Sequence, residues 1–255
     1  MAIDHAGVKE RFIQHTGYWD AECEALLALD PEYFQIVVNL VTAPSATGAL
    51  EPKIAALVQL AFDVSITHYD KDGAARHIAR AMASGATREE VLEVCQLTSV
   101  VGIHACNMGV PILAEELQAL NRGHELGPAE FDERRETLKA KFVELRGYWS
   151  PLWDDLLRNS PEFFEAYTQF SSYPWLKGGL PPKVKEFIYI AIDAATHHLY
   201  LPGLRIHIQN ALRHGATASE IMELLMLISA AGVKSSLVGA QALVAHAEKT
   251  SQRKQ

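Results

Sequence analysis

The sequence predicts an all-α protein that consists of two tandem copies of one helical module. Three observations support this prediction: short motifs recur at a constant separation, helix-capping residues precede several segments, and no sustained alternation of apolar and polar residues indicates a strand. A chain of 255 residues with 49% hydrophobic content can bury one large core or two ordinary ones. The order of the residues therefore decides the number of modules.

The internal repeat extends through both halves of the chain in one register. Gly17-Tyr18-Trp19 recurs 130 positions later as Gly147-Tyr148-Trp149. Further pairs with the same separation are Asp63 and Asp193, His68 and His198, Gly73 and Gly203, and His77 and His207. Residues 121–128 lie between the copies and contain the Gly and Pro residues of a linker. We therefore expect a first module at residues 1–127 and a second at residues 128–255.

Helix starts are marked at equivalent places in the two copies. Asp30-Pro31 and Ser160-Pro161 each place a capping residue before a proline, which is typical of a first helical turn. Residues 87–90 and 217–220 each fit a capping box, and long apolar stretches follow at residues 91–117 and 221–247.

Residues 171–180 mix aromatic and turn residues, which is typical of a binding loop. There, Tyr173 and Trp175 could cover a substrate ring or pack the modules together.

Composition excludes several classes of partner. A net charge of -8 without a run of lysines and arginines argues against nucleic acid. The first five residues do not resemble a signal peptide, and no apolar run reaches the roughly 18 residues of a membrane span. We expect a cytoplasmic protein without a membrane partner. The three cysteines, Cys23, Cys95 and Cys106, lack redox or metal-ligand spacing and are interpreted as core thiols.

The repeated histidines are the candidates for chemistry. In each copy a glycine lies between them, which predicts a helix, a tight turn and a second helix that bring residues nine apart together. Two interpretations stay open: a functional pair, or packed and capping histidines. A metal site would need a third and a fourth ligand, and although Asp63 or Asp193 could supply one, no cluster has ligand spacing. We expect no metal.

The second copy resembles the signature of the carboxymuconolactone decarboxylase family over residues 204–217, which read Leu-Arg-Ile-His-Ile-Gln-Asn-Ala-Leu-Arg-His-Gly-Ala-Thr. Residues 74–87 resemble it more loosely. Relatives of the alkylhydroperoxidase D type carry the motif Cys-x-x-Cys-x-x-x-His. Here Tyr200 and Gly203 stand in the cysteine positions of the second copy, and Asp70 and Gly73 in those of the first. A thiol peroxidase needs those two cysteines, so this activity is excluded.

The resemblance implies a cofactor-free lyase that acts on a small carboxylated lactone or another product of aromatic ring cleavage. We expect His207 to act as general acid or base, with His198 or His197 orienting it or binding the substrate. Arg205 is a candidate carboxylate anchor, unless it points to solvent. Glu186 fits the glutamate of the relatives' proton relay, unless it is a solvated first-turn acid. Tyr200 and Trp175 are further candidates for substrate binding.

The two copies differ in their candidate residues. The first has Ala56 in place of Glu186 and Thr67 in place of His197, whereas it has His104 where the second has Lys234. We therefore expect the second module to be active and the first, with His77, His68 and Asp70, to be a degenerate scaffold. The alternative is a composite site at the interface, to which His77, Asp70 or His104 contributes.

The resemblance also implies a homo-oligomer, as a trimer or a dimer of tandem modules. Two other functions stay open. The protein could be a non-catalytic scaffold or small-ligand binding protein, or an isomerase or hydratase on a related substrate.

Overall fold

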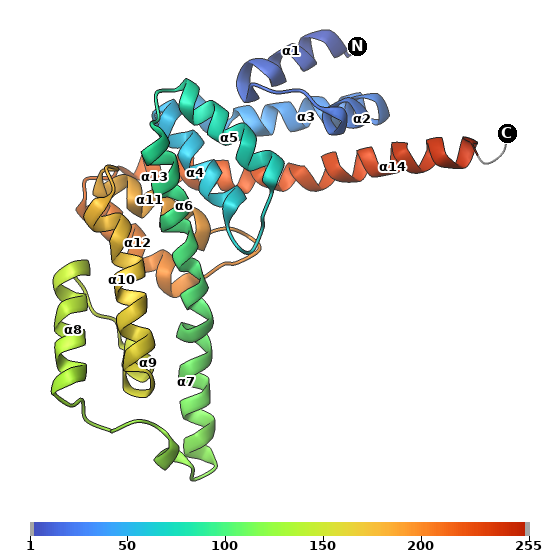
Figure 1. The fold of residues 1–255 in the computed structure, drawn as a ribbon. Helices are drawn as coiled ribbons and strands as arrows, with labels where there is room; N and C mark the ends of the chain where they lie inside the picture. Colours follow the sequence, from blue (N-terminus) through green and yellow to red (C-terminus); the bar gives the residue numbers. More distant parts are fainter. Residues whose placement is uncertain (1–2, 253–255) are drawn as a thin grey trace.

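The computed structural model describes residues 3–252, and every helix or strand assigned in that range is a helix (Figure 1). The predicted all-α fold is confirmed. The α-helices are α1 His5–Thr16, α2 Ala21–Leu29, α3 Pro31–Thr42, α4 Pro52–Val64, α5 Lys71–Ala83, α6 Arg88–Ser99, α7 His104–Ala119, α8 Glu133–Arg146, α9 Asp154–Asn159, α10 Pro161–Lys177, α11 Pro182–Asp193, α12 Leu201–Arg213, α13 Ala218–Ala230 and α14 Lys234–Gln252. Short 3-10 turns are η1 Pro44–Ala46, η2 Val100–Ile103, η3 Gly123–Glu125, η4 Pro151–Trp153 and η5 Ala231–Val233.

The helix starts follow the capping residues of the sequence. The Asp30 side chain accepts a hydrogen bond from the backbone N–H of Tyr33, and α3 begins at Pro31. Ser160 makes no such bond, so the fixed φ of Pro161 marks the start of α10. Both predicted capping boxes are present, at the N-termini of α6 and α13. Capping side chains and prolines therefore account for the starts of α3, α6, α10 and α13.

The predicted binding loop at residues 171–180 is wrong, because α10 continues through Lys177. Pro174 lies inside the helix, and the chain leaves it only at Gly178. Ser171, Ser172 and Pro174 are buried whereas Tyr173 is exposed, so tertiary packing of one helix face outweighs the local turn preference of these residues.

The central core joins both halves of the chain. Helix α4 packs against α11 and α13, and α11 packs against α6. Side chains from both halves are fully buried there, among them Leu57, Leu60, Ile188 and Ile190. Each such burial stabilises the fold by about 1.5–3 kcal/mol. The helices that carry the repeated histidines are therefore held by one shared core.

The last long helix of each half packs on the opposite half. In Figure 1, α14 extends beside α2, and the contacts between α14 and α2 place Leu237 and Ala240 in the core of the first half. Helix α7 packs against α9 and η4, and Ile103 joins the core formed by residues 138–164. This exchange brings His104 to the second half and Lys234 to the first.

Buried glutamates also connect the halves. Glu93 accepts hydrogen bonds from the backbone N–H groups of Gly179 and Leu180 at 2.7 and 2.9 Å, and it pairs with buried Lys185 at 2.9 Å. A Cβ at Gly178 would lie 2.1 Å from a Glu93 oxygen, which explains the glycine there. Glu223 binds the loop of the first half in the same way, at residues 47–50.

Two helical stretches, Arg88–Ala119 and Ala218–Ser251, are long and apolar enough to cross a membrane by length and composition alone. The sequence had predicted no candidate for a membrane span, because isolated polar residues interrupt every apolar run. The mean hydropathy of these two stretches is nevertheless as high as that of a membrane-spanning helix. Each stretch nevertheless carries a buried glutamate, Glu93 or Glu223, that binds the backbone of the other half. Ionisable residues are costly in a lipid-facing helix, so this arrangement favours core helices.

Candidate functional sites

Two cavities lie at equivalent places in the two halves. The second-half cavity has a volume of about 50 Å³, and the residues that matter for its chemistry are His104, Asn107, Arg146, Tyr189, Asp193, Tyr200 and His207. The first-half cavity has a volume of about 120 Å³ and is lined by His15, Gln59, Asp63, His68, Asp70, Arg76, His77, Arg80 and Lys234, among others. Each cavity includes residues from the exchanged helix of the other half.

His207 is held in a fixed orientation in the second half. Its Nδ1 atom lies 2.6 Å from Oε2 of Glu186, which is buried on α11. Asn210, one helical turn after His207, donates a hydrogen bond to Oε1 of Glu186 at 3.3 Å. The Nε2 atom of His207 then lies 4.0 Å from Oδ2 of Asp193. The predicted catalytic pair His207 and Glu186 is therefore in direct contact, and the second ring nitrogen lies next to a further acid.

Asp193 ends α11 and is buried at the wall of the second-half cavity. Its Oδ2 atom has no hydrogen-bond partner among residues 3–252. Burial, with repulsion from Glu186, raises the pKa of Asp193 to about 8. The group is therefore protonated at neutral pH, and it can donate a proton.

His198 meets His104 from the other half of the chain. The Nε2 atom of His198 lies 2.7 Å from Nδ1 of His104, and the two rings are stacked. Burial and the nearby histidines lower the pKa of His104 to about 3, and burial also lowers the pKa of His198. Both rings are neutral at pH 7. The second-half cavity is therefore lined by residues from both halves of the chain. The alternative prediction from the sequence, in which His104 contributes to a site at the interface, agrees with this position of His104.

Two groups of side chains have the proximity that metal ligands need. The ligand atoms of His104, Asp193 and His198 all lie within 4.8 Å of one another, and so do those of a first-half group at Asp63, His68 and Asp70. Sequence spacing did not reveal the former group because its members come from both halves. Its two histidines already share a hydrogen bond, which engages one nitrogen of each ring.

A stack of aromatic and cationic groups supports the His207 ring. The centroid of the Tyr189 ring lies 4.5 Å from that of His207, and the Tyr189 hydroxyl accepts a hydrogen bond from Trp175 at 3.1 Å. Arg146 lies over the Trp175 ring, 5.1 Å from its centroid, and donates to the carbonyl oxygen of Ser171 at 2.9 Å. Arg146 lines the cavity whereas Trp175 does not, so Trp175 contacts the site through Tyr189.

The other predicted site residues of the second half have different places. Tyr200 lines the cavity and stacks on His104 with 3.7 Å between ring centroids. Arg205 is exposed and lines neither described cavity. His197 is also exposed and stacks on His68 at 5.0 Å. The structure therefore brings Tyr200, but not Arg205 or His197, to the second-half cavity.

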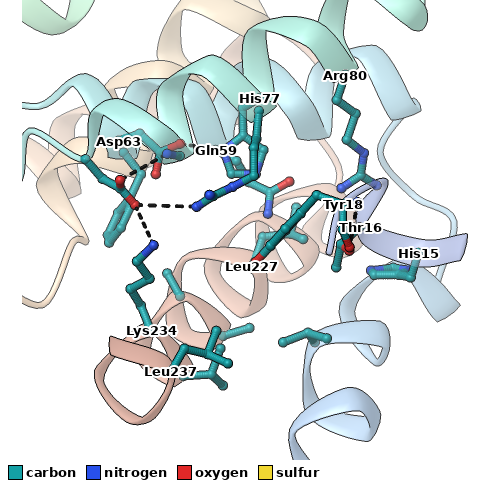
Figure 2. A pocket seen from close by; sticks show the side chains of 18 of the residues that line it. His15, Thr16, Tyr18, Gln59, Asp63, His77, Arg80, Leu227, Lys234 and Leu237 are labelled. Carbon is teal, nitrogen blue, oxygen red and sulfur yellow. Dashed lines mark hydrogen bonds and ion pairs between the residues drawn. The ribbon is translucent and has the colours of Figure 1, made fainter. Parts of the chain in front are cut away.

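In the first half, His77 on α5 bonds through Nδ1 to the buried carboxylate of Asp63 on α4 (Figure 2). Asp70 caps α5 by accepting a hydrogen bond from the backbone N–H of Gly73 at 3.0 Å. His68 is exposed at the rim of the cavity. The first half therefore keeps a histidine–carboxylate pair, but with a different acid from the one that binds His207.

Comparison with known proteins places this geometry in a family. The sequence pattern of the carboxymuconolactone decarboxylase family matches residues 161–245. A crystal structure of a protein from Burkholderia xenovorans LB400, provisionally named a gamma-carboxymuconolactone decarboxylase subunit, superposes with a TM-score of 0.93. The two sequences are 43% identical over 97% of this chain and 99% of that one. The chain belongs to the carboxymuconolactone decarboxylase family.

The family pattern falls on the second half, where Glu186, His198 and His207 lie. No curated protein matches the chain.

A further feature separates it from family members that use thiols. A Cβ at Gly203 would lie 2.2 Å from Oδ2 of Asp193, so a cysteine at this motif position would collide with that carboxyl group.

Sequence reasoning did not identify three side chains of the second-half cavity as catalytic or substrate-binding residues. Asp193 could have been found, because it repeats Asp63 in register. Arg146 precedes the repeated Gly-Tyr-Trp motif and replaces Thr16 of the first copy, so the charge difference was visible. Tyr189 gave no signal, because its position in an apolar helix is typical of a core residue.

Proposed function

We propose that the protein is a decarboxylase-type lyase that acts on a small carboxylated lactone or a related product of aromatic ring cleavage, with the second-half cavity as its active site. The observation that carries this proposal is the placement of His207 between Glu186 and the protonated Asp193. Membership of the carboxymuconolactone decarboxylase family supports the reaction class.

Decarboxylation breaks the bond between the carboxylate and the ring and releases CO₂. The electron pair of that bond moves into the conjugated lactone, and a proton must then add to carbon. In the proposed mechanism, Nε2 of His207 delivers that proton, and the carboxylate of Glu186 balances the charge of the doubly protonated ring. Asp193, protonated at neutral pH, can return a proton to His207, and solvent restores the starting state. The net reaction consumes one proton for each CO₂ released.

Arg146 replaces Arg205 as the proposed carboxylate anchor. It lines the second-half cavity, and a guanidinium group binds a carboxylate through two parallel hydrogen bonds. The cavity volume of about 50 Å³ admits a carboxylate and the atoms next to it, but not a large ring system. The proposal therefore favours a small substrate that has few atoms besides its carboxylate group.

The test is turnover of carboxymuconolactone by the purified protein in the presence of a chelator. Loss of lactone absorbance with one CO₂ released per turnover, and one deuterium incorporated into the product in D₂O, would support the mechanism. Turnover that the chelator abolishes would instead assign a metal to His104, Asp193 and His198. Absence of turnover with this and related lactone acids would contradict the proposed reaction class.

We also propose that copies of the chain assemble into a homo-oligomer. Large apolar side chains are exposed at equivalent positions of the two halves, in the pairs Tyr33 and Phe163, Leu40 and Phe170, Met108 and Val238, and Leu113 and Leu243. Scattered apolar residues are common on protein surfaces, but this set occurs twice in the same register. Such a surface suits an assembly in which the two halves take similar places.

A further inference from the structure

The first-half cavity contains a positive charge that has no ion-pair partner in the described part of the chain, residues 3–252. Arg80 on α5 is partly buried at the cavity wall, and Figure 2 shows its guanidinium group beside Thr16 and His15. No hydrogen bond or ion pair of this side chain occurs within residues 3–252. Burial lowers the pKa of Arg80, because it disfavours the charged form. A partly buried guanidinium that faces a cavity without an acceptor can bind an anionic ligand through charge-assisted hydrogen bonds.

In the second half, an acid near the cavity contributes to stabilising the charge of its arginine, although no ion pair joins the two among residues 3–252. Arg146 stands at the register position of Thr16, and Glu186 lies close enough to stabilise its charge. The first half has Ala56 in place of Glu186. The lining of the second-half cavity thus has one arginine, Arg146 from α8, whereas that of the first half has two from α5, Arg76 and Arg80. Arg76 pairs with Asp20 and Asp70, but no carboxylate among residues 3–252 pairs with Arg80.

The other charged groups of the first-half cavity are paired. Arg76 lies 3.5 Å from Asp20 and 3.9 Å from Asp70. Lys234, from the exchanged helix α14, lies 3.1 Å from Glu22 and 3.5 Å from Asp70. His77 bonds to Asp63, as described above. The unbalanced charge is therefore localised at Arg80.

The space beside Arg80 has apolar walls. Side chains from five helices, α1, α3, α4, α13 and α14, line it: Phe12, Val41, Phe62, Leu227 and Leu237. Gln59 adds a polar group, whose buried Oε1 atom has no hydrogen-bond partner among the described residues. The volume of about 120 Å³ exceeds that of the second-half cavity. A ligand that fits carries one acidic group and a compact apolar body.

We propose that the first-half cavity binds a small organic carboxylate, with its acidic group on Arg80 and its apolar body against Leu227 and Leu237. This site is separate from the proposed active site, and it shares neither its acid nor its arginine. Because Leu227 and Leu237 belong to α13 and α14, the ligand contacts both halves of the chain. The first copy is then a binding site with its own specificity.

Isothermal titration calorimetry with benzoate tests this proposal, because benzoate combines one carboxylate with a compact apolar ring. We expect the wild-type chain to bind benzoate, and Arg80→Gln to lose one benzoate site per chain or to weaken it by at least about tenfold, as expected for loss of a charged hydrogen bond. Arg88→Gln, which changes an exposed arginine of the same half, should leave binding unchanged. Benzamide, which has the same shape without charge, should bind at least about tenfold more weakly than benzoate.

A second variant tests the charge argument without removing the arginine. Ala56→Glu introduces the acid that the second half has at the equivalent position, and it should abolish the site while Arg80 is still present. His207→Gln should retain the site, so failure of the proposed reaction and failure of this proposal are distinguishable. Benzoate binding that survives Arg80→Gln unchanged, or no benzoate site in the wild-type chain, would overturn the proposal. If inorganic phosphate bound as tightly as benzoate, the proposal that the ligand needs an apolar organic body would be overturned.

Discussion

The Nε2 atom of His207 lies 4.0 Å from Oδ2 of Asp193, whereas the equivalent residues of the first half, His77 and Asp63, bond directly through Nδ1. The difference follows from Glu186, which takes the Nδ1 atom of His207 and has only Ala56 as its counterpart. One histidine therefore stands between two acids, and the other is bound to one. This asymmetry underlies the different roles proposed for the two cavities.

Glu186→Gln should reduce kcat while leaving KM nearly unchanged. The amide preserves a hydrogen bond to His207 but removes the negative charge that balances the doubly protonated ring. We expect kcat to fall by about 10²-fold, at the lower end of the range for general acid–base catalysis. Steady-state kinetics with the lactone acid measure this change. A kcat equal to that of the wild type would show that Glu186 takes no part in proton transfer.

Asp193 should make the stability of the protein fall as pH rises. Its pKa is about 8 in the folded chain and 3.8 when exposed, so between these values the folded state holds a proton that the unfolded state has lost. The stabilisation is complete below about pH 4 and is lost as pH approaches 8, with a slope of at most about 1.4 kcal/mol per pH unit.

Urea denaturation of the wild type and of Asp193→Asn at pH 5, 6, 7 and 8 isolates this contribution. The difference between the two free energies of unfolding should change steadily over that range, since the asparagine does not titrate. A constant difference would contradict the raised pKa of Asp193.

Truncation of the two connecting glutamates should have unequal costs. Glu93→Ala leaves Lys185 buried without a counter-charge, which costs about 3–5 kcal/mol. Glu223→Ala leaves backbone N–H groups and the Thr47 hydroxyl unsatisfied but no buried charge, because the residue equivalent to Lys185 is Ala55, so it costs about 1–3 kcal/mol. Chemical denaturation of both variants under the same conditions compares them. Equal losses would mean that Lys185 relaxes to solvent.

The proposed assembly predicts that Leu113→Glu lowers the molar mass in solution. Leu113 is 56% exposed on α7, and a charge on a surface covered by another copy would be desolvated without a partner. Light scattering after size-exclusion chromatography measures the mass, with Glu116→Gln as the control on the same helix. An unchanged mass, or a monomeric wild type, would exclude α7 from the interface.

The parts of the fold that local chemistry controls were predictable from sequence. The capping boxes and the prolines at helix starts act within one turn, so the boundaries of α3, α6 and α13 followed from a few residues. Residues 171–177 were mispredicted because their helix is stabilised by contacts distant in sequence. The exchange of α7 and α14 between halves is also a long-range property, and no local pattern predicts it.

The same distinction applies to the site. His207 and His198 were candidates because they recur in register in both copies, and Glu186 because it fits the glutamate of the relatives' proton relay. His104 was recognised only within an alternative, since its contact with His198 depends on the exchanged helix. Arg205 lies two positions before His207, and residues two apart on a helix point to different faces. Helical geometry alone could therefore have predicted that Arg205 does not face the same cavity as His207.

The most direct test of the proposed active site compares His207→Gln with its matched variant His77→Gln in the lactone turnover assay. The two substitutions make the same chemical change at equivalent positions of the two halves. We predict that His207→Gln loses at least about 10²-fold in kcat and that His77→Gln keeps wild-type kcat. Loss of turnover in His77→Gln with full activity in His207→Gln would contradict the account and place the chemistry in the first half.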